Sequence, residues 1–234
     1  MKKKTLFGLS FAALVLLATA THAFGQEPAR VSISVLSGGS FLKGERSFNV
    51  GGTPMRTNYA KGGKLGFRGT MSLSSQWALE GTYSYGRDNL RITDLSGATP
   101  STRGFGVKGH QFTGNVLYYL NPSADKFKFF GTAGIGLARF SPTDAAKASA
   151  AREFVDNPAT ISPSNKFDFN FGGGVEAKMG SWYGVRFDFR DHVSSIPRFG
   201  VPQNPTPGIA DFYPVSGAVH NFETSVGLVL YLKH

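Results

Sequence analysis

The 234-residue chain contains no cysteine, which excludes disulfide scaffolds, thiolate metal sites, cysteine nucleophiles and a lipid anchor on cysteine. Charge is also scarce, because Asp, Glu, Lys and Arg make up 17% of the residues, against about 25% in ordinary soluble domains. Beyond residue 20, no apolar run approaches the roughly 18 residues of a transmembrane helix. These absences disfavour an ordinary soluble domain, and they exclude a helical membrane protein once the first residues are set aside.

Basic residues outnumber acidic ones, with 25 Lys and Arg against 15 Asp and Glu. The basic residues are scattered and form no compact run, so we expect no nucleic-acid partner. A basic rim suits anionic lipid head groups or sugar phosphates instead. The residues concerned are Arg46, Arg56, Lys61, Arg87, Arg91, Arg103, Lys108, Lys147, Arg152 and Arg198.

The N-terminal residues have the pattern of a secretory signal. Three lysines at positions 2–4 precede an apolar run over residues 6–20, and Thr21-His22-Ala23 offers a small-residue cleavage site. We therefore expect a signal peptide over residues 1–23, with cleavage after Gly25 as the alternative, and one exported domain over residues 24–234.

The remainder of the chain alternates between apolar and polar residues with a period of two, which is the pattern of β-strands. Over residues 166–179, Phe167, Phe169 and Phe171 share one face, whereas Asp168 and Asn170 share the other. Gly172-Gly173-Gly174 falls inside this pattern, so it indicates a kink or close packing and no phosphate loop. The period predicts eight strands, at residues 31–35, 65–73, 77–85, 111–120, 127–137, 166–179, 183–190 and 220–232.

Short and long connections alternate between these strands. The short ones are residues 74–76, 121–126 and 180–181, and the long ones are residues 43–63, 87–109, 141–165 and 193–219. This asymmetry predicts an all-β, eight-stranded antiparallel up-and-down transmembrane barrel with short periplasmic turns and four long extracellular loops. Within the loops, the alanine-rich residues 143–155 predict a short helix, and the five prolines of residues 193–219 predict an extended surface.

Aromatic residues near the predicted strand ends suit the two membrane interfaces. They are Trp77, Tyr83, Tyr85, Tyr118, Phe127, Trp182, Tyr183 and Phe222. Alternation alone does not say which face is outside, so a soluble lipocalin-like carrier with an apolar interior stays an alternative.

The last strand carries a further signal in Ser225-Val-Gly227-Leu-Val-Leu230-Tyr231-Leu232. This segment resembles the C-terminal motif read by the outer-membrane barrel assembly machinery, and the whole mature chain resembles the OmpA/OmpX-like outer-membrane β-barrel family. The resemblance implies a monomer in the cell outer membrane, with outer-membrane lipids including lipopolysaccharide, and the assembly machinery, as partners. The chain departs from the family by continuing with Lys233-His234 instead of closing on Phe, and we expect no periplasmic peptidoglycan-binding domain after the last strand.

In a membrane barrel the polar faces of the strands point into the lumen. Nine charged residues of both signs then share the interior and must pair, which predicts an ion-paired plug, with a narrow gated ion path as the alternative. They are Arg68, Glu80, Asp168, Glu176, Lys178, Arg186, Asp188, Arg190 and Glu223.

One segment carries candidate catalytic chemistry. Asp188, Arg190, Asp191 and His192 together suggest acid–base work, and His192-Val193-Ser194 resembles the His-x-Ser of outer-membrane lipid A deacylases. Ser195 stands where that pattern has Asn, however, and no Glu follows about a dozen residues on. We therefore expect no catalytic, cofactor-binding or metal-binding residues, and a non-enzymatic role in envelope integrity or surface interaction. A lipid A-modifying hydrolase on the same barrel is the alternative enzyme.

Overall fold

The computed structural model describes residues 30–43, 45–50, 53–59, 62–153, 161–204 and 213–232. The predicted signal peptide and the terminal Lys233-His234 lie outside these residues. No helix in the described part of the chain is both long and apolar enough to cross a membrane.

The described residues form ten strands and one helix. The elements are β1 (Val31–Lys43), β2 (Arg46–Val50), β3 (Thr53–Tyr59), β4 (Gly62–Ser72), β5 (Trp77–Asp94), β6 (Ser101–Tyr119), β7 (Phe127–Pro142), α2 (Asp144–Glu153), β8 (Ser164–Lys178), β9 (Tyr183–Ser195) and β10 (Ala218–Leu232).

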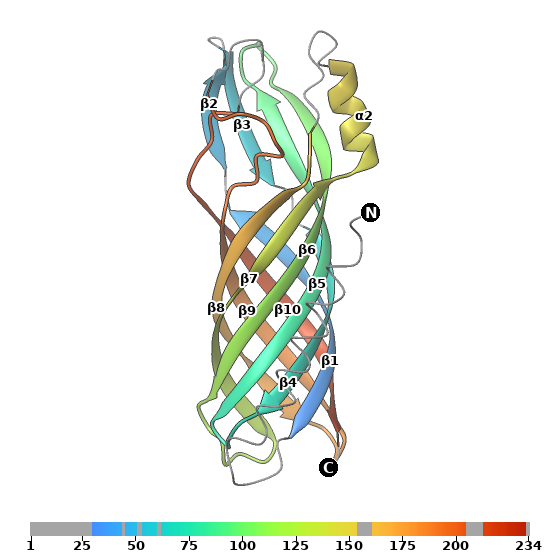
Figure 1. Cartoon of the computed structure of the whole chain (residues 1–234), viewed down its shortest axis with the longest axis vertical. Helices are drawn as coiled ribbons and strands as arrows, with labels where there is room; N and C mark the ends of the chain where they lie inside the picture. The colour runs from blue at the N-terminus through green and yellow to red at the C-terminus, as the bar shows by residue number, and fades with distance from the viewer. Residues whose placement is uncertain are drawn as a thin grey trace, which may run out of the picture.

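Eight of these strands close into a ring of antiparallel neighbours in the order β1-β4-β5-β6-β7-β8-β9-β10. The first and last strands complete it, with pairs running from Val31 opposite Leu232 to Lys43 opposite His220. All short turns lie at one end, and β2, β3 and α2 lie at the other (Figure 1). The predicted eight-stranded up-and-down barrel is confirmed.

Burial alternates along the strands and shows which face is outside. On β9, Val185, Phe187 and Phe189 are exposed, whereas the intervening Arg186 and Asp188 are buried. The apolar side chains thus form an outward-facing surface, which we call the apolar belt. It comprises Ile33, Val35, Leu65, Phe67, Phe112, Val116, Ile135, Leu137, Phe167, Phe169, Phe171, Val185, Phe187, Phe189, Val226 and Leu228. The lipocalin-like alternative, which needs an apolar interior, is wrong.

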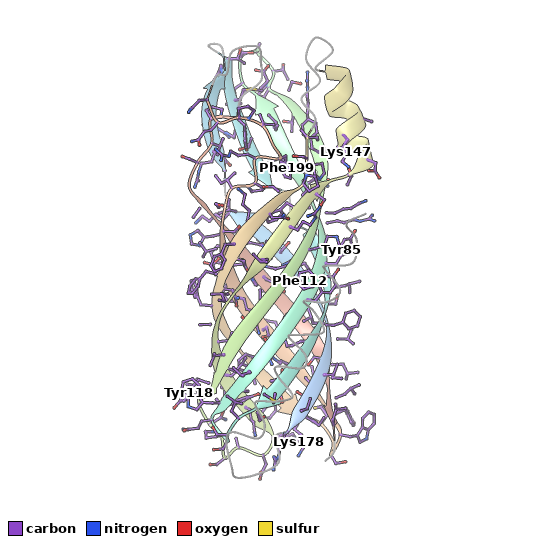
Figure 2. The ribbon with its side chains drawn as sticks, viewed as in Figure 1. Tyr85, Phe112, Tyr118, Lys147, Lys178 and Phe199 are labelled. Carbon is purple, nitrogen blue, oxygen red and sulfur yellow. The ribbon has the colours of Figure 1, made fainter. Side chains whose placement is uncertain are left out.

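Aromatic side chains gather at the end with the short turns. Trp77 packs against Tyr118 with 4.8 Å between ring centroids, and Trp182 packs against Tyr183 at the same distance; Tyr118 lies low on the barrel (Figure 2). Such rings suit the periplasmic interface.

The prediction placed two further tyrosines, Tyr83 and Tyr85, at a strand end, and this is wrong. Because β5 continues to Asp94, both lie within the strand, and Tyr83 packs 4.7 Å from Phe112, halfway along the barrel (Figure 2).

The extracellular connections contain more strand than the sequence predicted. Residues 87–109 are mostly a continuation of β5 and β6, paired from Arg87 opposite Lys108 to Asp94 opposite Ser101. Within residues 43–63, β2 and β3 form a hairpin, and β3 pairs with the end of β5. The predicted helix in residues 143–155 is confirmed as α2, whose start is capped where the Ala146 amide donates to Thr143 Oγ1 over 3.2 Å.

The Gly172-Gly173-Gly174 run lies inside β8, as the alternation predicts. A Cβ atom on Gly172 would clash with the backbone oxygen of Phe189, and one on Gly174 would clash with that of Phe187. These glycines therefore allow β8 and β9 to approach closely, and the close-packing interpretation is confirmed.

Candidate functional site

The centre of the lumen holds a cluster of three arginines and two carboxylates, which we call the ionic layer: Arg68 from β4, Glu80 from β5, and Arg186, Asp188 and Arg190 from β9. Arg68 Nη1 lies 2.8 Å from Asp188 Oδ2, Arg186 Nη1 lies 2.9 Å from Glu80 Oε2, and Arg190 Nη2 lies 2.7 Å from Glu80 Oε1. Each is at most 3% exposed. Both carboxylates thus face all three guanidiniums.

Strand geometry explains why these residues meet. Arg186, Asp188 and Arg190 are spaced two apart, so one strand places all three side chains on its inner face. Arg186 Nε and Nη2 both donate to Asp188, over 3.0 and 2.9 Å. The Arg186 guanidinium also lies 4.0 Å from the ring centroid of Phe130, a cation–π contact. The ionic layer therefore packs directly on the apolar residues below it.

A second buried polar cluster connects five strands, β4, β6, β8, β9 and β10. Lys64 Nζ donates to Gln111 Oε1 over 2.7 Å and pairs with Glu223. Gln111 Nε2 lies 2.9 Å from Asp168 Oδ2 and 2.7 Å from His192 Nδ1. His192 Nδ1 in turn lies 2.9 Å from Asp168 Oδ2. Polar side chains thus bridge the lumen at this level also.

Apolar layers close both ends of this polar interior. At the periplasmic end, Ala78, Leu117, Tyr119 and Phe130 form a buried cluster. At the extracellular end, Leu90 and Val107 from the extended β5–β6 hairpin bury Phe199 from the β9–β10 connection. Phe199 lies at the base of the extracellular part, above Tyr85 and Phe112 (Figure 2). We call this upper cluster the extracellular cap.

The β9–β10 connection is fixed at further points. Ile196, Val215 and Val219 form another buried cluster, against which Tyr213 packs. The Tyr213 hydroxyl donates to Thr57 Oγ1 over 3.2 Å, and burial of its ring raises the pKa of the phenol above its ordinary value. The described part of this connection is thus tied to the β2–β3 hairpin.

A small cavity lies inside the lumen. A cavity of about 10 Å³ lies between the two polar clusters, which is room for about one water molecule. It is lined by Arg68, Thr82, Ser84, Gln111, Thr113, Arg190, His192 and Glu223.

Eight of the nine predicted lumen charges are buried inside the barrel. Lys178 is the exception, since it is exposed in the last position of β8, at the periplasmic end (Figure 2). Lys64 is absent from the predicted lumen charges because the predicted strand begins at Leu65, one residue after it, whereas β4 begins at Gly62. The prediction also missed the partners of His192, which alternation alone does not identify.

The candidate acid–base residues do not form one site. Alternation sends Asp188, Arg190 and His192 into the lumen and Asp191 to the outer face, where Asp191 Oδ2 lies 2.7 Å from His220 Nδ1. Within the described residues, no group of three or more His, Asp or Glu side chains could hold a metal ion.

The membrane-facing exterior and charged interior agree with a comparison against protein families. The model of the outer membrane protein beta-barrel domain matches residues 9–212. The chain belongs to this family. It is therefore an outer-membrane barrel, with the apolar belt in lipid, the short turns in the periplasm and the long connections outside the cell. None of the curated proteins compared matches the chain.

Solved structures share this architecture at low sequence identity. Neisserial surface protein A is 12% identical with a TM-score of 0.52, covering 87% of this chain and 99% of its own. AlkL, an outer membrane protein solved in lipid bilayers, is 17% identical with a TM-score of 0.51, covering 90% and 93%. Ail, the attachment invasion locus protein of Yersinia pestis, is 10% identical with a TM-score of 0.49, covering 88% and 100%. These similarities concern the fold.

Proposed function

We propose that this family member is a non-enzymatic outer-membrane barrel that supports envelope integrity or surface interaction through its extracellular connections. The observation that carries the proposal is the filled interior. Two polar clusters and two apolar clusters lie inside the barrel, and a cavity of about 10 Å³ lies between the polar clusters.

The ion pairs inside the lumen also argue against an ion path. The ionic layer connects β4, β5 and β9 through direct ion pairs at 2.7–3.3 Å. Opening a path would separate buried charges from their partners, which costs several kcal/mol per ion. A protein built in this way supports a rigid wall and leaves recognition to the loops.

The geometry of His192 argues against the hydrolase alternative. Its Nδ1 atom is directed at Asp168 and Gln111, and its Nε2 atom lies 3.6 Å from Glu223 Oε2. His192 is only 5% exposed. A histidine held in this way directs both ring nitrogens at lumen side chains and not at the surrounding lipid.

Two assays on the purified barrel test the proposal. We expect no discrete conductance in planar bilayers and no deacylation of lipid A. Conductance that changes on charge reversal at Arg186 or Glu176 would establish the ion path instead. Deacylation lost in Ser194→Ala or His192→Ala would establish the hydrolase.

We further propose that the barrel acts as a monomer, is exported by a signal peptide over residues 1–23 and is inserted by the barrel assembly machinery. Its mobility on a gel with and without boiling, measured in the outer-membrane fraction, tests insertion. Replacement of Leu230 and Leu232 by Asp should reduce the heat-shifted band if the C-terminal motif is read during assembly. Light scattering of the detergent complex tests the monomer.

A further inference from the structure

An open pocket of about 300 Å³ lies between the start of β8 and the β9–β10 connection. This volume is at the lower end of the range for small-molecule sites. Among the described residues, its lining includes two cations, Lys166 and Arg198, two neutral hydrogen-bonding side chains, Ser164 and Gln203, and no carboxylate. The remaining lining residues are Gly200, Val201 and Pro202.

The two cations differ from those of the ionic layer and from Lys64. Those lumen cations each face a carboxylate within 4 Å, whereas Lys166 and Arg198 form no ion pair within the described residues. Asp168 lies two positions along β8 on the same face, but His192 and Gln111 hold it. Two partly buried charges of one sign in one pocket repel each other, and an anion between them would relieve that repulsion.

The loop is built to hold Arg198 in place. Phe199, next in the chain, is buried in the extracellular cap, and its carbonyl accepts from the Ser162 amide over 2.8 Å. Phe199 and Gly200 both have positive φ, at 54° and 86°, a conformation that costs energy for Phe and persists only where surrounding contacts enforce it. Arg198 Nη1 donates to Gln203 Oε1 over 2.5 Å, which orients the guanidinium within the pocket.

We propose that this pocket binds a phosphate or sulfate group carried by a sugar. Arg198 presents a planar set of donors that matches a tetrahedral oxyanion, and Lys166 adds a point charge from the opposite wall. Ser164 and Gln203 supply hydrogen bonds to the sugar. The inference rests on the proposed surface role and gives that role a ligand class.

Titration calorimetry on the full-length barrel in lipid nanodiscs tests the pocket, with glucosamine 1-phosphate and inorganic sulfate as probes. We expect saturable binding that weakens with added salt, and at least tenfold weaker binding in the double variant Lys166→Gln/Arg198→Gln. The matched control is Arg91→Gln/Lys147→Gln, which removes the same charge from two exposed extracellular residues outside the pocket. The control should bind within twofold of the original protein.

A second arm distinguishes the two sources of the oxyanion. Nanodiscs that contain a phosphorylated glycolipid are compared with nanodiscs that contain its dephosphorylated form. Loss of glucosamine 1-phosphate binding only in the phosphorylated discs identifies the surrounding lipid as the natural ligand. Unchanged binding in both identifies a soluble or cell-surface sugar.

Two results would overturn the pocket: no saturable binding by the original protein, or equal losses in the control and the double variant. The boiling-dependent gel shift, run on every variant, checks that the barrel has formed. Conductance or lipid A deacylation would contradict the proposed function without affecting the calorimetry, so the two failures are distinguishable.

Discussion

The ionic layer and the extracellular cap are held together by different forces. In the ionic layer, five buried charged side chains from three strands contact one another directly. In the cap, Phe199 packs on Leu90 and Val107 at the end of a connecting segment. The first region links strands that are far apart in the ring, whereas the second attaches a loop to the extended β5–β6 hairpin, with Phe140 and Ile161 packed against it.

Because of this difference, we expect the ionic layer to govern the stability of the barrel and the cap to govern the conformation of the extracellular loop. Damage to the ionic layer affects strands that span the membrane, so it should lower the stability of the whole barrel. Damage to the cap should loosen the segment around Phe199 and leave the barrel wall intact, because the closed ring of backbone hydrogen bonds does not pass through Phe199. The following predictions test that separation.

The largest effect is expected for Glu80→Gln. Among the described residues, this substitution leaves Asp188 as the one carboxylate within ion-pair distance of the three buried arginines. We therefore expect a loss of about 3–5 kcal/mol in the free energy of unfolding. Urea unfolding of the barrel in lipid vesicles, followed by the boiling-dependent gel shift, measures it. The control is Glu45→Gln, because Glu45 pairs with Arg56 on the surface with both side chains about half exposed; its loss should be about 0–1 kcal/mol. Equal losses would contradict the ionic layer's role.

A smaller loss is expected for Arg190→Met. With three arginines and two carboxylates, the layer carries one excess positive charge, and removing an arginine leaves two of each sign. Both Glu80 and Asp188 keep contacts with Arg68 and Arg186. We expect a loss of about 1–2 kcal/mol, below that of Glu80→Gln. The same urea series measures this loss. A loss larger than that of Glu80→Gln would show that charge balance does not determine how much the ionic layer contributes to stability.

Removing the cap's anchor should change the loop more than the barrel. Phe199→Ala deletes a buried ring, which we expect to weaken local protection of residues 196–204 by about 2–3 kcal/mol. Hydrogen exchange on this segment measures the effect, and urea unfolding should stay within about 0.5 kcal/mol of the original. Phe167→Ala is the control, because Phe167 is 60% exposed on the apolar belt. If Phe199→Ala lowers global stability as Glu80→Gln does, the two regions are not separable.

The residues that the sequence identified correctly are those whose position follows from alternation. Arg186, Asp188 and Arg190 are two apart, so their common face follows from the amino-acid pattern alone. The β5–β6 extension could not be predicted in this way, because residues 87–109 lack the regular apolar alternation of the membrane part. Strands that lie outside the bilayer need no apolar outer face. The pocket of Lys166 and Arg198 also escaped prediction, since it depends on how a proline-rich connection folds back onto β8.

The smallest effect is expected for Asn170→Leu, which compares two buried amides within the lumen. Asn170 is fully buried, and neither of its amide atoms has a hydrogen-bond partner among the described residues. Replacing an unsatisfied polar group by an apolar one of similar shape is nearly neutral or stabilising, so we expect a change within about 1 kcal/mol. Asn115→Leu is the matched comparison, because Asn115 Nδ2 donates to Thr113 Oγ1 over 3.1 Å and to Glu80 Oε1 over 3.4 Å. It should lose about 1–3 kcal/mol. If Asn170→Leu proves the more costly of the two in urea unfolding, then its amide is satisfied by ordered water, and the lumen is more hydrated than its direct contacts indicate.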